Sequence, residues 1–334
     1  MYYTLIILYA IILAHLAVVA AFNNNVFHTH NRVTLSTRVT LSTSSSSSSF
    51  RNRRYFATTN ANRVSLSTSS FRNRRYFATT NAQDSSVLVV DEMPPPLPPL
   101  NNYYYLLRHG QSTANVEGII SSARSLSGST KHGLTLLGIE QARGSAASLI
   151  DSIAEDINND DSTKQVYFYS SPFARAKETA EQCIKGINAN EEVADKVKSS
   201  GLEINTDITL DDGLLERYFG RLDGKELPTY AYVWPVDMML PTHTAFDVES
   251  VAAVSTRIRN TLIKIDAEHP KGGDHIVLTS HADTLQITQV YAAGIDNVGR
   301  FSEFRFGNGE VRKMGRSIDT LPEAVPLQPP KRGE

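Results

Sequence analysis

The sequence predicts an α/β fold, a mostly parallel sheet with helices on both faces. Short apolar runs typical of strands alternate with helical patterns from about residue 103 onward, which indicates successive strand-helix-strand units. Histidines directly follow two of these runs, at His109 and His281, and the carboxyl ends of parallel strands are where such folds bind ligands. The only cysteine, Cys183, lies in a helical pattern and excludes an intrachain disulfide, so the fold depends on its apolar core.

Residues 1–21 have the pattern of a secretory signal peptide. The stretch from Leu5 to Ala20 is apolar except for Tyr9 and His15 and is followed by Ala21, so that small residues precede a possible cleavage site. The stretch is short for a membrane span. A signal anchor is the alternative, because no Lys or Arg precedes the apolar run.

Residues 22–83 are predicted to be a disordered, transit-like segment. They are rich in Ser, Thr and Asn and contain nine arginines but no acidic residue. A 14-residue stretch that begins at Ser48 recurs at Ser69, without the continuous apolar face that a solenoid repeat needs. The two N-terminal segments together resemble a bipartite plastid-targeting presequence, with secretion or an endomembrane lumen as the alternative destination. No stable membrane association is expected after processing.

A Pro-rich linker, residues 84–101, leads to the predicted catalytic domain at residues 102–320, and residues 321–334 are predicted to be a disordered tail. The whole chain carries a net charge of −2 and residues 22–83 carry +9, so the rest of the chain carries −11. A domain this acidic lacks the surplus cations that non-specific nucleic-acid binding requires, and nucleic acid is not expected as a partner.

Eight elements are expected in the domain. In order, they are a strand over Tyr103–Leu107, a helix from Leu136 to Ile153, a strand over Gln165–Ser170, a helix over Phe173–Ile187, a helix over Val248–Ala267, a strand over His275–Ser280, a helix over Ala282–Ala293 and a hairpin joining Glu303–Phe306 to Glu310–Met314. Thr135 is the expected N-cap of the first helix, and Ser171 followed by Pro172 is the expected start of the second. Asn308-Gly309 is typical of a hairpin turn.

Arg108-His109-Gly110 is the most informative motif of the chain. It places a guanidinium and an imidazole at the carboxyl end of the first predicted strand. Three residues alone are weak evidence, because such matches arise by chance. Four longer segments strengthen it: residues 108–115, Ser170 to Ala180, Leu215 to Gly220, and Ser280 to Asp283.

In order and spacing, these segments resemble the histidine phosphatase superfamily in its phosphoglycerate-mutase-like branch, over roughly residues 103–314. The resemblance implies a phosphoglycerate-mutase-like fold and phosphoryl transfer through a phosphohistidine. His109 is the expected nucleophile, a neutral imidazole whose other ring nitrogen donates to a backbone carbonyl. Arg108, Arg175 and a protonated His281 are expected to complete the phosphate pocket.

Asn115, Gln111 and Ser112 are candidates for neutral contacts to the phosphate. The mechanism requires no metal and no other cofactor, and the remaining histidines show no metal-ligand spacing. A small-molecule phosphate ester is the expected partner, and no sequence pattern specifies an oligomeric state.

Two carboxylates are candidates for the proton donor. Glu216 lies in Leu215 to Gly220, which resembles the segment where the mutase-like branch keeps its acid. Asp283 lies near the position used by the acid-phosphatase and phytase branch, but that branch carries a further Arg where this chain has Ser112. Glu216 is therefore preferred, in a partly dry pocket that raises its pKa. Asp283 is expected to complement a helix dipole.

The sequence favours a phosphatase over a mutase. A phosphoglycerate mutase must hold a carboxylate and a second phosphate, yet residues 226–256 contain no Lys or Arg. They contain instead an apolar set that suits a lid: Tyr230, Tyr232, Trp234, Met238, Met239 and Phe246. Gln111, where the mutases usually carry Glu, points the same way. A 2,3-bisphosphoglycerate-dependent mutase and a non-catalytic regulatory protein are the alternatives.

Overall fold

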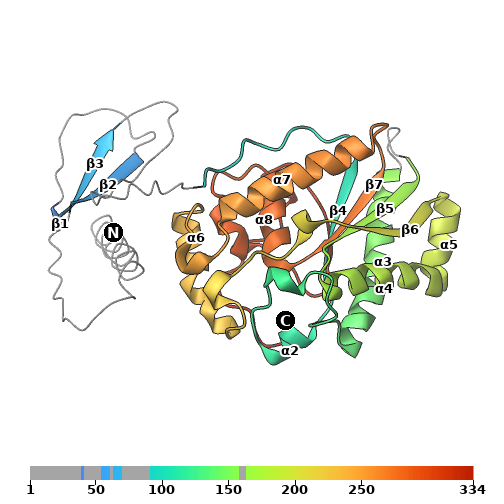
Figure 1. Cartoon of the computed structure of the whole chain (residues 1–334). Coiled ribbons are helices and arrows are strands. Elements are labelled where there is room, and N and C mark those ends of the chain that lie inside the picture. The colour runs from blue at the N-terminus through green and yellow to red at the C-terminus, as the bar shows by residue number, and fades with distance from the viewer. Residues whose placement is uncertain (1–38, 41–53, 61–62, 70–90, 158–162, 334) are drawn as a thin grey trace. The chain divides into compact units, whose positions relative to one another are not determined.

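A computed structural model of the chain describes residues 39–40, 54–60, 63–69, 91–157 and 163–333 (Figure 1). The chain divides into two units, Met1–Val90 and Asp91–Glu334. The signal-like segment 1–21 and most of the transit-like segment 22–83 lie outside the described residues.

A three-stranded sheet forms from the described residues of the first unit. β1 (Val39–Thr40) pairs in parallel with β3 (Arg63–Ser69), and β3 pairs antiparallel with β2 (Arg54–Asn60). All three strands lie in the segment that the sequence predicts to be transit-like.

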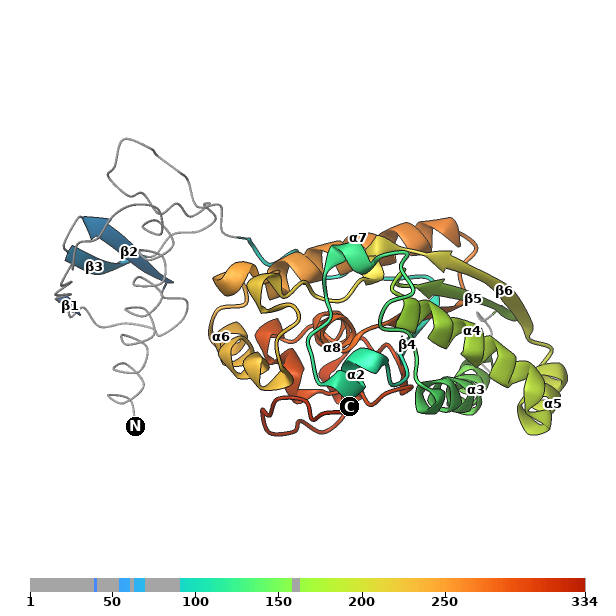
Figure 2. The same cartoon turned by 60° about the horizontal axis from the view of Figure 1, so that its bottom comes forward.

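A mixed sheet of five strands, in the order β6-β5-β7-β4-β8, forms the centre of the second unit (Figures 1 and 2). The strands are β4 (Tyr103–Arg108), β5 (Gln165–Ser170), β6 (Glu203–Leu210), β7 (His275–Ser280) and β8 (Val311–Lys313). The first four are parallel to one another, and β8 pairs antiparallel with β4. The predicted α/β class with a mostly parallel sheet is confirmed.

Helices cover both faces of this sheet (Figure 1). The α-helices of the second unit are α2 (Thr113–Glu117), α3 (Leu136–Ile157), α4 (Ala174–Ala189), α5 (Glu191–Ser200), α6 (Trp234–Met239), α7 (Val251–Glu268) and α8 (Ala282–Ala292). Buried side chains of α3, α4 and α5 form one apolar cluster against the sheet, and those of α7 and α8 belong to a second, separate cluster.

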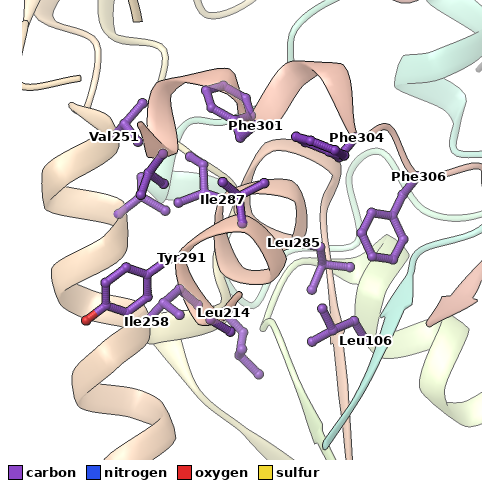
Figure 3. Packing of buried hydrophobic residues seen from close by; sticks show 14 of the residues in the cluster. Leu106, Leu214, Val251, Ile258, Leu285, Ile287, Tyr291, Phe301, Phe304 and Phe306 are labelled. Carbon is purple, nitrogen blue, oxygen red and sulfur yellow. The ribbon is translucent and has the colours of Figure 1, made fainter. Parts of the chain in front are cut away.

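β4 is apolar along its whole length because helices cover both faces of the sheet. Tyr104 and Leu106 belong to the cluster of α7 and α8, whereas Tyr105 and Leu107 belong to the cluster of α3 and α4. Successive side chains of a strand point to opposite faces, so a strand covered on both faces is apolar throughout rather than alternating. Figure 3 shows Leu106 of β4 together with Leu285 and Ile287 of α8 in the first of these clusters.

Most predicted elements are confirmed. β5 and β7 have the predicted bounds, and α8 ends one residue earlier than predicted. Thr135 caps α3, because its Oγ1 accepts a hydrogen bond of 3.0 Å from the backbone nitrogen of Gly138. α7 begins later than predicted, at Val251, since the Ser250 hydroxyl caps it by accepting from the backbone nitrogen of Ala253 at 2.9 Å.

Two local predictions are wrong. Phe173 rather than Ser171 is the N-cap of α4, and the Ser171 hydroxyl bonds to His281 Nε2 at 2.8 Å. The hairpin around Asn308-Gly309 does not form. β8 pairs with β4 instead, and the carbonyl of Phe304 accepts from the Gln289 side chain at 2.5 Å rather than from a partner strand.

The described part of the predicted linker, residues 91–101, and the predicted tail both pack within the second unit. In the linker, the Pro95 carbonyl accepts a hydrogen bond from the Tyr291 hydroxyl, and Leu97 is buried in the apolar core. In the tail, the Val325 nitrogen donates to the Glu303 carbonyl at 2.8 Å, and the Gly333 nitrogen donates to the Asn115 carbonyl at the same distance. Among the described residues, no helix has the length and apolarity needed to cross a membrane.

Candidate active site

The carboxyl ends of β4, β5 and β7 meet at one edge of the sheet and place the predicted site residues side by side. Arg108 is paired with Ser280 in the β4-β7 register, so His109 and His281 follow at the same level. The centroids of the two imidazole rings are 5.1 Å apart. A cavity of about 560 Å³ opens at this edge, and Arg108, His109, Arg175 and Glu216 line it.

His109 is held as a neutral imidazole. Its Nδ1 lies 2.7 Å from the carbonyl oxygen of Gly110, which accepts the ring proton, while Arg175 Nε donates to His109 Nε2 at 3.2 Å. Burial of the ring, followed by the neighbouring charges of Arg175 and Arg108, lowers the pKa of His109 well below its usual value of 6.5. The expected hydrogen bond to a backbone carbonyl is confirmed, and Nε2 carries no proton, so that its lone pair accepts the bond from Arg175 Nε.

A close backbone approach fixes the loop that carries His109. A Cβ atom on Gly110 would lie 2.3 Å from the Gly138 carbonyl oxygen, and one on Gly138 would lie 2.0 Å from the carbonyl oxygen of Gln111. Only glycine allows the loop after β4 and the first turn of α3 to pack this closely.

Arg175 and Arg108 approach His109 from different elements. Arg175, in the first turn of α4, is buried, and its Nη2 donates to the Ser121 carbonyl at 2.8 Å. Burial lowers its pKa to about 10, so it keeps its charge near neutral pH. Arg108, at the end of β4, donates from Nη1 to the Phe306 carbonyl at 2.6 Å. Two buried guanidinium groups at one cavity favour a bound dianion.

His281 contacts Arg175 at the carboxyl end of β7. Its Nδ1 accepts from Arg175 Nε at 3.2 Å, and its Nε2 donates to the Ser171 hydroxyl at 2.8 Å. Burial and then the charge of Arg175 lower the pKa of His281 well below 6.5. Without a bound anion, the guanidinium beside this buried imidazole disfavours the protonated His281 that the sequence predicts.

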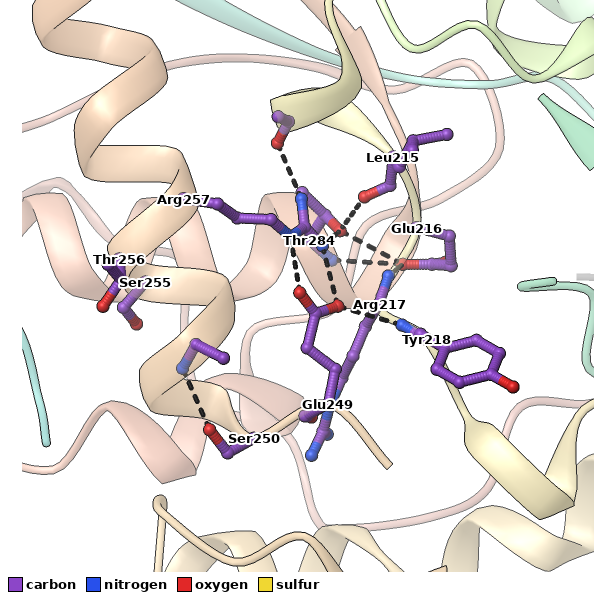
Figure 4. A network of polar contacts seen from close by, with 12 residues as sticks. Leu215, Glu216, Arg217, Tyr218, Glu249, Ser250, Ser255, Thr256, Arg257 and Thr284 are labelled. Atoms are coloured by element: carbon purple, nitrogen blue, oxygen red, sulfur yellow. Dashed lines mark hydrogen bonds and ion pairs between the residues drawn. The ribbon is translucent and has the colours of Figure 1, made fainter. Parts of the chain in front are cut away.

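Both candidate acids lie at the cavity. Glu216 is buried, and its Oε1 accepts from the backbone nitrogen of Arg217 at 2.9 Å and from the Thr284 hydroxyl at 3.3 Å (Figure 4). Asp283, in the first turn of α8, accepts from Trp234 Nε1 at 3.1 Å. Burial, followed by the charge of Glu216, raises the pKa of Asp283 to about 7. Asp283 is thus a cavity residue that can hold a proton near neutral pH, and not only a complement to the helix dipole.

The three candidates for neutral phosphate contacts have other partners. Ser112 and Asn115 form a capping box at α2, in which the Ser112 nitrogen donates to Asn115 Oδ1 at 2.9 Å, and both residues line the cavity. Gln111 does not line it. Its Nε2 donates to the Gly333 carbonyl at 2.9 Å and its Oε1 accepts from the Thr135 hydroxyl at 2.9 Å.

The predicted apolar lid is only partly at the cavity. Tyr230 and Trp234 are buried and line it, whereas Tyr232 and Met239 are exposed to solvent. The reason is that residues 227–239 are short helical turns, so that successive side chains point in different directions.

Sequence reasoning missed the C-terminal part of the cavity. Arg305, Phe306 and Asn308 line it, as do Val325, Pro326 and Gly333 of the tail. None of these residues belongs to the four segments that predict the site, and only their position in the folded chain brings them to the cavity. Within the described part of the chain, no group of three or more His, Cys, Asp or Glu side chains could hold a metal ion.

Comparisons with known proteins agree with the geometry. Residues 104–320 match the sequence model of the histidine phosphatase superfamily, branch 1. A search of curated proteins gave no match.

Several solved structures are similar to this chain. A mycobacterial hydrolase is 19% identical with a TM-score of 0.46, over 64% of this chain and 90% of its own. The α-ribazole phosphatase of Shigella flexneri is 20% identical with a TM-score of 0.44, over 68% and 99%. A mycobacterial glucosyl-3-phosphoglycerate phosphatase, solved with inorganic phosphate, is 17% identical with a TM-score of 0.43, over 70% and 99%.

Proposed function

This chain belongs to branch 1 of the histidine phosphatase superfamily, and on that basis we propose that it is a phosphomonoester hydrolase that acts on a small organic phosphate through a phosphohistidine intermediate. The observation that carries the proposal is the state of His109, a neutral imidazole with its Nε2 at a cavity lined by Arg108 and Arg175.

In the first step, His109 Nε2 attacks phosphorus. The bond between phosphorus and the ester oxygen breaks as the bond to nitrogen forms, and Glu216 donates a proton to the leaving oxygen. In the second step, water attacks the phosphohistidine, the Glu216 carboxylate takes a proton from that water, and the phosphorus-nitrogen bond breaks to release inorganic phosphate. Arg108 and Arg175 neutralise the charge on the phosphoryl oxygens throughout.

Asp283 is the second candidate for the proton donor. It is favoured by its raised pKa of about 7, since an effective general acid must still hold its proton at the working pH. Both carboxyl groups line the same cavity, so substitution of each is needed to assign the role.

A mutase is supported less well. A mutase needs cations for a second anionic group, and residues 226–256 contain none. Arg217 and Arg124, which lie outside this range, are already bound to carboxylates. Arg217 binds Asp237 with two hydrogen bonds of 2.7 Å, and Arg124 binds Glu249 at 2.8 Å. We therefore expect kcat/KM for hydrolysis of simple monophosphates to exceed that for interconversion of 3- and 2-phosphoglycerate by at least about tenfold, or about 1.4 kcal/mol.

Two assays test the proposal. The protein should release phosphate from p-nitrophenyl phosphate without added metal, which a non-catalytic relative would not do. Phosphoglycerate interconversion should be measured with and without 2,3-bisphosphoglycerate. Rapid interconversion with little release of phosphate would show that the protein is a mutase and not a phosphatase.

We also propose delivery to a plastid through the N-terminal presequence. This part of the proposal rests on the composition of residues 1–83, with nine arginines and no acidic residue between 22 and 83.

A further inference from the structure

We propose that Gln286 and Tyr230 form a neutral polar subsite that binds a hydroxyl group of the leaving group, so that the preferred phosphomonoesters carry a free hydroxyl a few bonds from the ester oxygen. The inference rests on the proposed phosphatase function and adds a substrate class to it.

Gln286 has a buried amide that no described protein group satisfies. Its side chain belongs to α8, is 2% exposed and lines the cavity. No described residue forms a hydrogen bond with the amide, although buried polar side chains are normally hydrogen-bonded. Neither amide atom belongs to the fully enclosed polar atoms without a partner in the described part of the chain. Both atoms are therefore open to the cavity, where a ligand can reach them.

The other buried glutamine of the same helix differs in this respect. Gln289 Nε2 donates to the Phe304 carbonyl at 2.5 Å, and Gln289 Oε1 accepts from Arg312 Nη1 at 3.0 Å. The two threonines of α8 likewise donate to backbone carbonyl groups. The polar groups of Gln289 thus contribute to the fold, whereas those of Gln286 face the cavity.

Gln286 lies close to the reacting phosphate. α8 directly follows His281, and Gln286 comes one helical turn after Asp283, on the same face of the helix. Three residues of an α-helix span about 4.5 Å along its axis. Helical side chains also lean toward the N-terminus of their helix, which here is the end at His281. A leaving group that extends from the phosphate along α8 therefore meets Gln286 within a few bonds.

Tyr230 adds a hydroxyl group to the same cavity. Its buried ring packs against Trp234 with the centroids 4.6 Å apart, and Trp234 Nε1 donates to Asp283 at 3.1 Å. No described residue forms a hydrogen bond with the Tyr230 hydroxyl. Burial, followed by the charge of Asp283, raises the pKa of Tyr230 well above 10, so that this hydroxyl keeps its proton and can donate. Contacts through Trp234 and Asp283 thus link Tyr230 to the helical turn that carries Gln286.

The chemistry of the two side chains fits a hydroxyl group. A carboxamide and a phenol are uncharged, and each can both donate and accept a hydrogen bond, as a hydroxyl does. An anionic group here would lie near Asp283 and Glu216, two carboxyl groups of the same cavity that repel it when ionised. An alkyl group would displace water from the amide without replacing its hydrogen bonds. The subsite therefore favours a hydroxyl over either group.

A matched series of esters tests the inference. The probes are monophosphates of linear diols with two to four carbons, each compared with the alkyl phosphate in which a methyl group replaces the free hydroxyl. In the wild-type protein, kcat/KM for the best diol ester should exceed that of its alkyl partner by about 5- to 100-fold, the range for a buried polar group that gains or lacks its hydrogen bond. Gln286→Leu should lower this ratio by at least about fivefold, and Tyr230→Phe should also lower it.

Gln289→Leu is the control. The same substitution one turn further along α8 removes two hydrogen bonds within the protein, so it should lower Tm by at least about 2 °C but leave the ratio unchanged. Gln286→Leu removes no bond to a described residue, and its Tm should stay within about 2 °C of that of the wild-type protein.

A wild-type ratio near one, or an unchanged ratio in Gln286→Leu, overturns the inference. An unchanged ratio in Tyr230→Phe alone removes Tyr230 from the subsite. If the wild-type protein hydrolyses none of the esters, the proposed function fails instead, and calorimetric titration of the same ester pairs tests the subsite separately. Tighter binding of the diol ester that is lost in Gln286→Leu supports the subsite, and equal dissociation constants for the two esters overturn it.

Discussion

A histidine attacks phosphorus only while one ring nitrogen keeps its lone pair, and the surroundings of His109 secure that form. The Gly110 carbonyl accepts the proton of Nδ1, and burial beside two arginines disfavours a second proton. We therefore expect His109 to remain unprotonated throughout the neutral pH range, so that its own titration does not limit the rate there.

His109→Ala should abolish the covalent intermediate and reduce kcat/KM by at least about a thousandfold, or about 4 kcal/mol of barrier. Wild-type protein denatured during turnover of labelled substrate should carry an acid-labile, base-stable phosphate, and the variant should carry none. Labelling that persists in His109→Ala would assign the nucleophile to another residue.

Glu216→Gln should slow hydrolysis of esters with poor leaving groups by about 100- to 10,000-fold, because the departing oxygen then lacks a proton. Hydrolysis of p-nitrophenyl phosphate should slow much less, since nitrophenolate leaves without one. Rates for an alkyl and a nitrophenyl ester, compared in Glu216→Gln and Asp283→Asn, check the assignment. The two roles must be exchanged if only Asp283→Asn shows this dependence on the leaving group.

Asp283 should also make stability depend on pH. Its pKa rises from an ordinary 3.8 to about 7 in the folded protein, so between these pH values the folded state binds more protons than the unfolded state. The free energy of unfolding should therefore fall as pH rises from about 4 to 7. Asp283→Asn should remove this contribution, on the order of 1–3 kcal/mol, as measured by urea unfolding at both pH values. An identical pH dependence in the variant would contradict the raised pKa.

The residues around the reacting phosphate could be predicted from the sequence because each lies in a contiguous motif at the end of a strand. Gln111 and Arg305 could not be placed correctly. The Gln111 side chain does not line the cavity and donates instead to the carbonyl of Gly333, more than 200 residues further along the chain. Arg305 reaches the cavity only because its segment packs on Arg108 and Arg312. Contacts of this kind leave no periodic signal.

At the level of elements, a buried ion pair joins α6 to the segment after β6. Arg217 is fully buried and donates two hydrogen bonds to Asp237. Asp237 also accepts a hydrogen bond of 2.8 Å from His243 Nε2. A pair of this kind ties the residues next to Glu216 to the helix that carries Trp234.

Arg217→Ala should destabilise the protein by about 3–5 kcal/mol, because Asp237 is left charged and buried without its main partner. For a unit of this size, that corresponds to a fall in Tm of about 6–20 °C. Arg221→Ala is the matched control, since its pair with Asp247 is exposed and should contribute less than about 1 kcal/mol. Thermal unfolding of both variants tests this, and equal shifts in Tm would refute the role given to Arg217.

Strands and helices with a clear apolar period could be predicted within a few residues, whereas the C-terminal hairpin could not. Asn308 and Gly309 are residues typical of a hairpin turn, and Gly309 has the positive φ, +71°, that such a turn requires. Val311–Lys313 nevertheless pair with the edge of β4, the strand that leads to His109. Tertiary pairing therefore determines the position of β8, not the local turn.

For the whole molecule, the N-terminal segments predict processing. The protein isolated from cells should lack at least residues 1–21 and, with removal of the transit-like part, everything before about Asp84. N-terminal sequencing of the mature protein measures this directly. Recovery of Met1 or the residues just after it would exclude cleavage of the signal-like segment.

The order of strands in the sheet has a consequence for synthesis on the ribosome. β4, the first strand of the sheet, pairs with β7 and β8, and its register with β7 begins with Tyr103 opposite His275. At about 5–20 residues per second, roughly 10–35 s pass between the emergence of these two residues. During that interval an apolar strand has neither neighbour to pair with, and it is a candidate for aggregation or for binding by chaperones. Nascent chains stalled before β7 should therefore be rich in bound chaperone and devoid of phosphatase activity.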